Sequence, residues 1–484
     1  MLFSSYIFIL IFLPIVLLGY YSINHFIKDK DHGKWWLVLS SLFFYGYWYP
    51  PYLFIILSSI IINFSLAKVI QPQEFGKKKK TFFLLGLIFN IGLLGYFKYR
   101  DFFLENLNFV LSTDIHFAKL ALPLGISFFT LQQIAFLVDV YEGLAKEKKF
   151  VDYSLFVCFF PQLIAGPIVH YKDIIPQFEA KDNNHFISKN FSLGIYIFCL
   201  GVFKKIMLAD TFSGWANEGF DHTAELHFFH AWGTSLSYTM QLYFDFSGYS
   251  DMAIGLGHMF NIKIPKNFNS PFKARNIIDF WNRWHITLSQ FITTYIFTPM
   301  FRSFKKLSFR NSLLSIFFTM LIAGIWHGAG WTFVVYGMMY GSALVVNHLM
   351  KKKKMKLPKW LAILITFQFT NIVFTMFRAN SISDALKVYK GMLGLSFFKF
   401  PKGMISNDAI TSLGAQLGQH MNNDENLNLL MIIVCLFIVF KFKNSMELSD
   451  NFKPSLKVAM ACAFMFVISL FGMNRVSDFI YFNF

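Results

Sequence analysis

The chain has 484 residues, of which 55% are hydrophobic, 20% are aromatic and only 15% are charged. Soluble domains carry about 25% charged residues, so this composition excludes an ordinary soluble protein and predicts an all-α polytopic membrane protein. The formal net charge of +17 would also suit a nucleic-acid-binding protein. However, the lysines and arginines form short clusters between apolar runs, as the positive-inside rule describes, and we expect no binding to nucleic acid.

The N-terminal apolar run, residues 1–21, begins a series of predicted membrane crossings. No basic region precedes it and no small-residue cleavage site follows, so a cleaved signal peptide is not expected. The first lysines come after this run, which predicts an extracytoplasmic N-terminus. Further crossings are predicted at residues 35–48, 52–69, 81–97 and 117–141, with the lysines of residues 77–80 in the cytoplasm.

Two apolar stretches are predicted to be re-entrant segments. Residues 150–168 are interrupted by Pro161, Gly166 and Pro167, and both this stretch and residues 286–299 have basic residues on each side. Irregular backbone inside a membrane must be buried in protein or line a water-filled cavity. Gln162, in the first stretch, is therefore a candidate site-lining residue.

The apolar segments at residues 190–209 and 232–260 contain polar side chains that are costly inside a membrane. Lys204 and Lys205 either end a short crossing or reach toward an anionic group. Asp245, Ser247 and Asp251 are candidate site-lining residues. The two carboxylates do not share a helix face, so hydrogen bonding inside the bundle is favoured over a paired-carboxylate mechanism.

The basic stretch at residues 263–310 is predicted to lie on the cytoplasmic side. It could bind the phosphate groups of an anionic donor, although the positive-inside rule by itself explains most of these charges. The tryptophans in and near it are packing residues or substrate contacts. The candidate donor-binding residues are Trp281, Asn282, Arg283, Trp284, Trp326, Lys273 and Arg302.

Two histidines at the ends of apolar runs, His285 and His327, are the candidates for chemistry. A histidine is costly where water is scarce, so it either has a function or is hydrogen-bonded between helices. The glycines beside His327 would let backbone or substrate approach it. Helical spacing would place His285 on one face with Trp281 and near Asn282. Because an imidazole accepts protons near neutral pH, the pair predicts a proton-transfer centre that needs no metal.

The remaining crossings are predicted at residues 312–326, 331–349, 360–377, 427–440 and 456–471, with the lysines of residues 351–354 in the cytoplasm. Residues 378–426 form the only long polar loop and are predicted to be extracytoplasmic. The chain is thus predicted to form a single membrane domain, residues 1–484, with about eleven to thirteen transmembrane helices. We find no internal repeat of the kind that paired transporter halves show.

Residues 280–285 (FWNRWH) and 325–328 (IWHG) resemble the motifs of the membrane-bound O-acyltransferase (MBOAT) family. They are most similar to its bacterial branch, which acetylates polysaccharides or D-alanylates teichoic acid. Residues 122–128, 160–167 and 245–251 also fit, and residues 479–484 resemble the ending of that branch, with Asn483 where glutamine is expected. The resemblance therefore covers nearly the whole chain.

The resemblance implies a bacterial inner-membrane O-acetyltransferase in which His327 is catalytic and His285 is the second characteristic histidine. It implies acetyl-CoA as donor substrate, no bound cofactor, a surrounding of membrane lipid, and an extracytoplasmic transferase partner. Peptidoglycan is the first choice of acceptor and an alginate-like exopolysaccharide the second. The rival class is a transporter, because transporters also contain intramembrane His and Asp residues and broken helices. The missing repeat and the acyltransferase motifs oppose that alternative.

Overall fold

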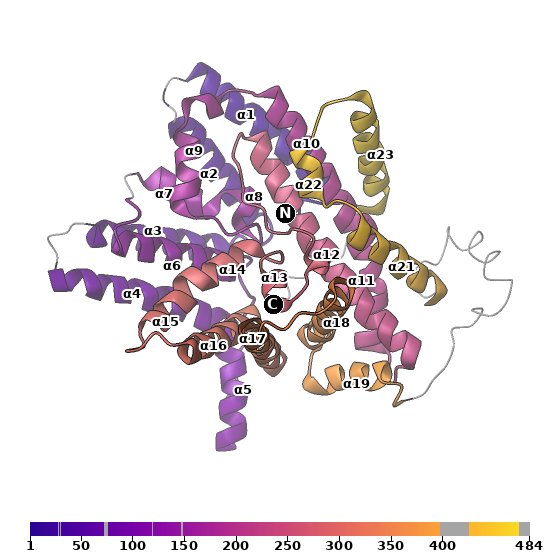
Figure 1. The fold of residues 1–484 in the computed structure, drawn as a ribbon. Coiled ribbons are helices and arrows are strands. Elements are labelled where there is room, and N and C mark those ends of the chain that lie inside the picture. The colour runs from indigo at the N-terminus through magenta and orange to yellow at the C-terminus, as the bar shows by residue number, and fades with distance from the viewer. Residues whose placement is uncertain are drawn as a thin grey trace. The chain divides into compact units, whose positions relative to one another are not determined.

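The computed structural model describes residues 1–473, except residues 28, 30, 72–75, 119, 147–148 and 397–424. Every secondary-structure element in this part of the chain is a helix, which agrees with the predicted all-α class (Figure 1). The chain divides into two compact units. Unit 1 comprises Met1–Cys199, Tyr249–Lys266 and Phe452–Ala459, and unit 2 comprises Leu200–Gly248, Asn267–Asn451 and Met460–Phe484. The motif at residues 479–484 lies outside the described residues.

Unit 1 is a set of helices from the N-terminal part of the chain, packed around aromatic side chains. The rings of Phe8, Phe44 and Phe160 lie 5.6–6.0 Å apart, from centroid to centroid, and all three are fully buried. The elements in order are η1 (Phe8–Phe12), α1 (Leu13–Phe26), α2 (Asp31–Gly46), α3 (Tyr52–Ile70), α4 (Gly76–Leu94), η3 (Gly95–Tyr99), α5 (Arg100–Leu111), α6 (Ile126–Tyr141), α7 (Phe150–Cys158), α8 (Phe160–Leu163), α9 (Tyr171–Glu179), η4 (Lys181–Asn184) and α10 (Ser188–Phe203), which continues into unit 2.

The first stretch that was predicted to be re-entrant, residues 150–168, is broken and buried. The helix stops at Phe159, which has an extended backbone (φ −51°, ψ 111°), and resumes as the single turn α8. Gln162 is 1% exposed and donates a hydrogen bond from Nε2 to the Phe156 carbonyl at 2.9 Å. A buried ion pair between Lys34 and Asp152, 2.6 Å long, joins α2 to α7. This irregular backbone is thus enclosed by protein, as expected, and its re-entrant path stays a prediction.

Unit 2 holds the later part of the chain, from Lys204 to α23. Several helices begin at polar caps: the side chains of Asn276, Ser308 and Ser381 accept a hydrogen bond from the third residue of the helix that follows. The elements are η5 (Lys204–Ala209), α11 (Asp210–Asn217), η6 (Glu218–His222), α12 (Phe228–Met259, which ends in unit 1), η7 (Pro271–Lys273), α13 (Ile277–Trp281), α14 (Ile286–Ile292), η8 (Thr293–Phe297), α15 (Thr298–Arg302), α16 (Phe309–His327), α17 (Trp331–Lys352), α18 (Lys359–Arg378), α19 (Ile382–Met392), α21 (Glu425–Lys441), α22 (Ser445–Asp450) and α23 (Leu456–Gly472, which begins in unit 1).

The two lysines that interrupt an apolar run begin the π-helical segment η5, and both have polar partners within the protein. The helical segment Ser188–His222 continues through them, so the helix itself does not end at these lysines, and where the crossing ends stays a prediction. Lys205 is 4% exposed and pairs with Asp210 at 2.8 Å and with Asp245 at 2.9 Å. Lys204 donates to the Ser445 hydroxyl at 2.8 Å. A π-helix aligns residues five apart, which places Lys205 beside Asp210. The anionic groups that Lys205 reaches are the protein's own carboxylates.

Seven helical segments in the described residues are long and apolar enough to cross a membrane, which confirms the polytopic class. Three shorter apolar helices, Ile126–Tyr141, Asn426–Lys441 and Leu456–Gly472, add to them. The predicted count of eleven to thirteen is not reached by helices of spanning length in this part of the chain. The difference arises because α2 and these three helices have fewer than 18 residues, and because α12 carries many polar side chains along its length.

Candidate active site

His285 lies in a turn between helices α13 and α14, and it does not belong to the helix that contains Trp281. Helix α13 ends at Trp281, Asn282 closes it, and His285 adopts a left-handed backbone (φ 46°, ψ 53°) before α14 begins. The prediction that Trp281, Asn282 and His285 share one helix was therefore wrong. Such a conformation costs a residue with a Cβ about 1–2 kcal/mol, so local preference alone would not select it here.

The His285 ring is fully buried and fixed from two sides within unit 2. Its Nδ1 lies 3.2 Å from the side-chain oxygen of Asn267. Phe246, on α12, meets the imidazole edge-on, with ring centroids 4.6 Å apart. Burial lowers the pKa of His285, which lies outside the seven spans, well below 6.5, and a charge on His327 lowers it further.

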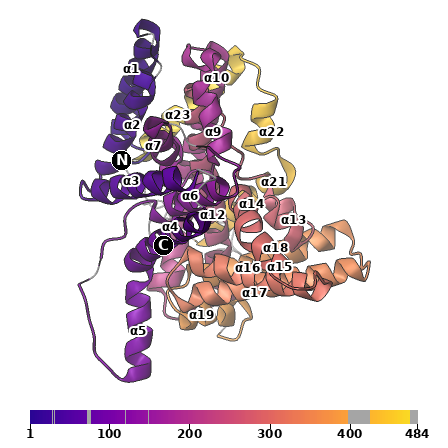
Figure 2. The same ribbon diagram turned by 90° about the vertical axis from the view of Figure 1, so that its left-hand side faces the viewer.

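His327 is the last residue of α16, at the turn of a tight helical hairpin with α17. The two helices run side by side in both ribbon views (Figures 1 and 2). A Cβ added to Gly324 would lie 2.6 Å from the Gly337 Cα, and one added to Gly337 would lie 2.8 Å from the Met320 carbonyl oxygen. The absence of side chains at these two positions lets the helices approach closely and fixes where His327 sits.

Aromatic rings enclose the His327 imidazole, which is 4% exposed. Ring centroids lie 5.6 Å away for Tyr336 and 5.4 Å away for Phe377, both in edge-on geometry. Gly328 leaves room for the ring of Phe333, while nothing lies within 3.4 Å of a Cβ added at Gly330. The glycines thus admit backbone and an aromatic ring beside His327, and access for a substrate stays a prediction.

A chain of aromatic contacts connects the two predicted motifs. Trp281 contacts Tyr340 at 5.0 Å, Tyr340 contacts Tyr336 at 5.1 Å, and Tyr336 contacts His327. Trp284 packs against Phe374 at 5.0 Å. Trp281 and Trp284 are buried and Trp326 is half-buried. The first two pack against neighbouring rings, and substrate contact by any of the three stays a prediction.

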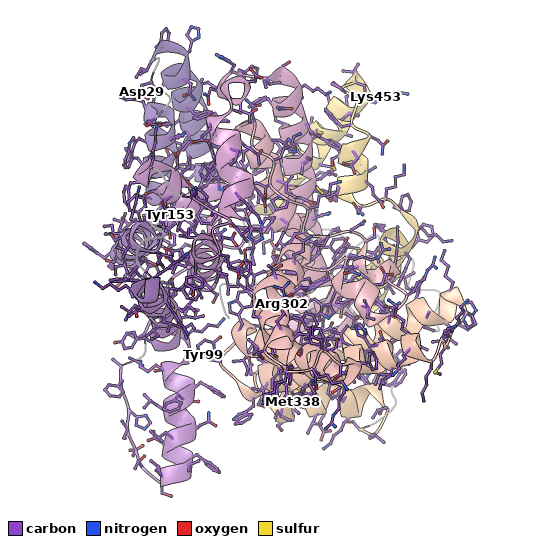
Figure 3. All side chains as sticks on the ribbon, turned by 60° about the vertical axis from the view of Figure 1, so that its left-hand side comes forward. Asp29, Tyr99, Tyr153, Arg302, Met338 and Lys453 are labelled. Carbon is purple, nitrogen blue, oxygen red and sulfur yellow. The ribbon has the colours of Figure 1, made fainter. Side chains whose placement is uncertain are left out.

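The basic residues that were predicted to bind the donor differ in their hydrogen bonds to the protein and in their exposure. Arg283 donates to Asp279 at 2.7 Å, and Lys273 donates to the carbonyl of Phe442 at 2.6 Å. Arg302, at the end of α15, is exposed and is labelled in Figure 3. Asn282 is exposed as well. Donor binding by these residues stays a prediction, and Arg302 is the most accessible of the charged candidates.

Two of the four site-lining candidates, Asp245 and Ser247, belong to unit 2. Asp245 is paired with Lys205, and Ser247 is 1% exposed. Asp251 and Gln162 are buried in unit 1, whereas both histidines belong to unit 2, and a site-lining role for these two residues stays a prediction. The expected hydrogen bonding of Asp245 takes the form of a hydrogen-bonded ion pair with Lys205.

Sequence reasoning missed Asn267, Tyr336 and Phe377, which surround the histidines. No motif marks them, and only the fold brings them to the two rings. A polar asparagine between basic residues was the one available signal for Asn267.

Comparison with known proteins identifies the family. The model of the membrane-bound O-acyltransferase family matches residues 146–383. The peptidoglycan O-acetyltransferase of Helicobacter pylori is 42% identical over 100% of this chain and 98% of its own length. The chain belongs to the MBOAT family. This MBOAT protein is therefore an acyltransferase, and the transporter alternative is set aside.

Further MBOAT relatives modify other polymers. The probable alginate O-acetylase AlgI of Pseudomonas aeruginosa is 33% identical over 81% of this chain and 75% of its own length. The teichoic acid D-alanyltransferase of Bacillus subtilis is 31% identical over 53% of this chain and 69% of its own length. Together with the seven apolar spans, these bacterial relatives make the chain a multi-pass protein of the bacterial inner membrane, as the sequence predicted.

Proposed function

We propose that this MBOAT protein transfers acetyl groups for the O-acetylation of peptidoglycan. The observation that carries the proposal is the full-length similarity to the Helicobacter pylori peptidoglycan O-acetyltransferase. The alginate O-acetylases, at lower identity and coverage, make an alginate-like exopolysaccharide the second candidate acceptor. In both cases an ester forms between an acetyl group and a sugar hydroxyl.

The histidine pair supports a metal-independent acyl transfer from a thioester, for which we propose acetyl-CoA. The acceptor oxygen attacks the thioester carbonyl, the carbon–sulfur bond breaks, and the hydroxyl proton finally reaches the sulfur. His327 accepts that proton as general base, and His285 acts on the donor side. Both rings are buried among aromatic side chains, where proton transfer is shielded from bulk water. The basic stretch at residues 263–310, which includes Arg302, attracts the anionic donor.

Measuring ester-linked acetate in the cell wall tests the proposal. Deleting the gene should remove the acetate that mild base releases from purified peptidoglycan, and wild-type protein should restore it. A His327→Ala protein present at the same membrane level should not restore it. Unchanged peptidoglycan acetate in the deletion strain contradicts the proposal. Loss of acetate from a secreted polysaccharide instead would assign the second acceptor.

We further propose that α19 helps to dock an extracytoplasmic transferase that completes the reaction. Ala385 and Val388 are buried, and Lys387 donates to the carbonyls of Phe220 and Thr223 at 2.9 and 2.8 Å, so one face of α19 is fixed to unit 2. The other face exposes Ile382 and Leu386, at 41% and 50%.

Replacing Ile382 and Leu386 with serine tests this docking face without disturbing the anchored side of the helix. Polysaccharide acetylation should fall while acetyl-CoA turnover by the purified protein is unchanged. Retained acetylation would mean that these side chains face lipid. Scrambling all of residues 383–390 is a poorer test, because it also removes the buried contacts of Ala385 and Val388.

A further inference from the structure

Asn267 holds the turn that carries His285 through both its side chain and its backbone. Its side-chain oxygen lies 3.2 Å from His285 Nδ1, 3.2 Å from the Thr287 backbone nitrogen and 2.9 Å from the Thr287 hydroxyl. Its backbone carbonyl accepts a hydrogen bond from the Ile286 N–H at 3.0 Å. One buried residue thus contacts three consecutive positions at the start of α14.

These contacts determine which His285 nitrogen carries hydrogen. The Thr287 backbone N–H can only donate, so the Asn267 atom that faces it must be the carboxamide oxygen and not the nitrogen. A carboxamide oxygen only accepts, so the Nδ1 that points to it must carry the hydrogen. In the neutral ring the lone pair is then on Nε2, which is the only nitrogen of His285 that can accept a proton.

The backbone at His285 supports a functional reason for this arrangement. Asn267 binds the left-handed histidine itself (φ 46°) and the two residues that follow it, and the edge-on ring of Phe246 restricts rotation of the imidazole. Residues in such costly conformations persist where the surroundings over-determine them, and they cluster at active sites. A histidine that served only to fill space would need neither the strain nor the shared acceptor.

We propose that Asn267 is a positioning residue that fixes His285 as the Nδ1–H tautomer and directs Nε2 to proton transfer in the acyl-transfer reaction. Within the proposed function, on which this inference rests, Nε2 receives the acceptor's hydroxyl proton from His327 and gives it to the thiolate sulfur as the carbon–sulfur bond breaks. Nδ1 keeps its hydrogen throughout, so protons balance: one leaves the hydroxyl and one reaches the thiol.

The test compares Asn267→Leu with Asn267→Asp in the full-length protein, using acetyl-CoA as the thioester probe. The leucine removes the acceptor oxygen, so kcat should fall about 10²-fold, and the KM for acetyl-CoA should change in the same direction as in His285→Ala. The aspartate still accepts from Nδ1–H and from Thr287, so it should retain kcat within about tenfold of wild type. Asn428→Leu is the matched control, because Asn428 is also a buried asparagine of unit 2 that accepts a side-chain hydrogen bond, from Ser237 at 2.8 Å. The Asn428→Leu variant should lower the thermal midpoint and leave kcat close to the wild-type value.

A double-mutant cycle separates positioning from folding. If Asn267 acts through His285, then Asn267→Leu should cost no further activity in a His285→Gln background. An additive loss in that background, or a kcat for Asn267→Leu equal to wild type, overturns the inference. An aspartate variant as inactive as the leucine variant would overturn it too. Absence of acetyl transfer by the wild-type protein would instead contradict the proposed function, so the two failures are distinguishable.

Discussion

At the scale of single residues, the two histidines are buried by different means. His285 is held by a shared hydrogen-bond acceptor in a strained turn, whereas His327 is the last residue of α16 and is enclosed by rings. The sequence motifs single out both histidines as candidates, because these motifs are local, and the catalytic roles of the two residues stay predictions. The sequence could not predict Asn267 or the break before His285, because a left-handed histidine depends on contacts with a segment that is distant along the chain.

The two histidines should differ when each is replaced. His327→Ala should abolish acetylation, since loss of a general base alone costs typically 10²- to 10⁴-fold, whereas His285→Ala should leave measurable activity with an altered dependence on acetyl-CoA. Wall-bound acetate and initial rates at several donor concentrations measure both effects. His327→Gln is the control, because it keeps bulk but cannot accept a proton at neutral pH. Near-normal acetylation by His327→Gln, with an inactive His285→Ala, would reverse the roles.

At the scale of elements, the α16–α17 hairpin positions His327 through glycines. Their apolar runs predicted both helices, but not that Gly324 and Gly337 lie against the backbone of the opposite helix. The sequence pattern suggested that the glycines beside His327 serve access to the histidine, and the structure gives one of them, Gly324, a packing role.

Gly324→Val should therefore weaken the hairpin and displace His327. The added side chain would meet backbone atoms at 2.6 Å, which cannot give way as a flexible side chain would. Overpacking of this kind costs about 1–3 kcal/mol, so the thermal midpoint and the acetylation should both fall. Gly330→Ala is the control for stability, since its nearest neighbour would be 3.5 Å away. A Gly324→Val protein as stable as Gly330→Ala would contradict the packing role.

A second prediction at this scale concerns the ion pairs of η5. Lys205→Met leaves Asp210 and Asp245 buried without their shared cation, which should cost about 3–5 kcal/mol. Changing both aspartates to asparagine in the same protein should recover much of the loss, because no buried charge then remains in the group. Thermal midpoints in detergent compare the variants. If Lys205→Met were as stable as the triple variant, the charges would not be the source of the cost.

At the scale of the whole molecule, composition and charge clusters predicted the class and the order of the apolar helices. They could not predict the number of helices of spanning length, because an apolar run does not reveal where its helix begins and ends, and α2 and three other apolar helices have fewer than 18 residues. The orientation of the chain in the membrane also stays a prediction. It rests on the lysine clusters alone.

Single cysteines introduced at residues 79 and 353 should be labelled only from the cytoplasmic side, because lysine clusters resist export. A cysteine at Ser381, in the loop that was predicted to be extracytoplasmic, should be labelled in intact cells by a membrane-impermeant maleimide. Cys462 is partly exposed and should be replaced first, whereas Cys158, Cys199 and Cys435 are buried. Labelling of the lysine clusters from outside would invert the orientation.

The buried lysine of η5 also has a consequence for biosynthesis. A lysine at the centre of a membrane helix raises the free energy of insertion by about 2.5–3.5 kcal/mol. When the ribosome has released the span Ser188–His222, Asp210 has already been made, but Asp245 belongs to the next long helix and has not yet reached the membrane. Asp210 is therefore the partner that can accompany Lys205 through the translocon, and Asp245 joins only when α12 packs. The two ion pairs of Lys205 thus form at different times: the pair with Asp210 during insertion and the pair with Asp245 during assembly.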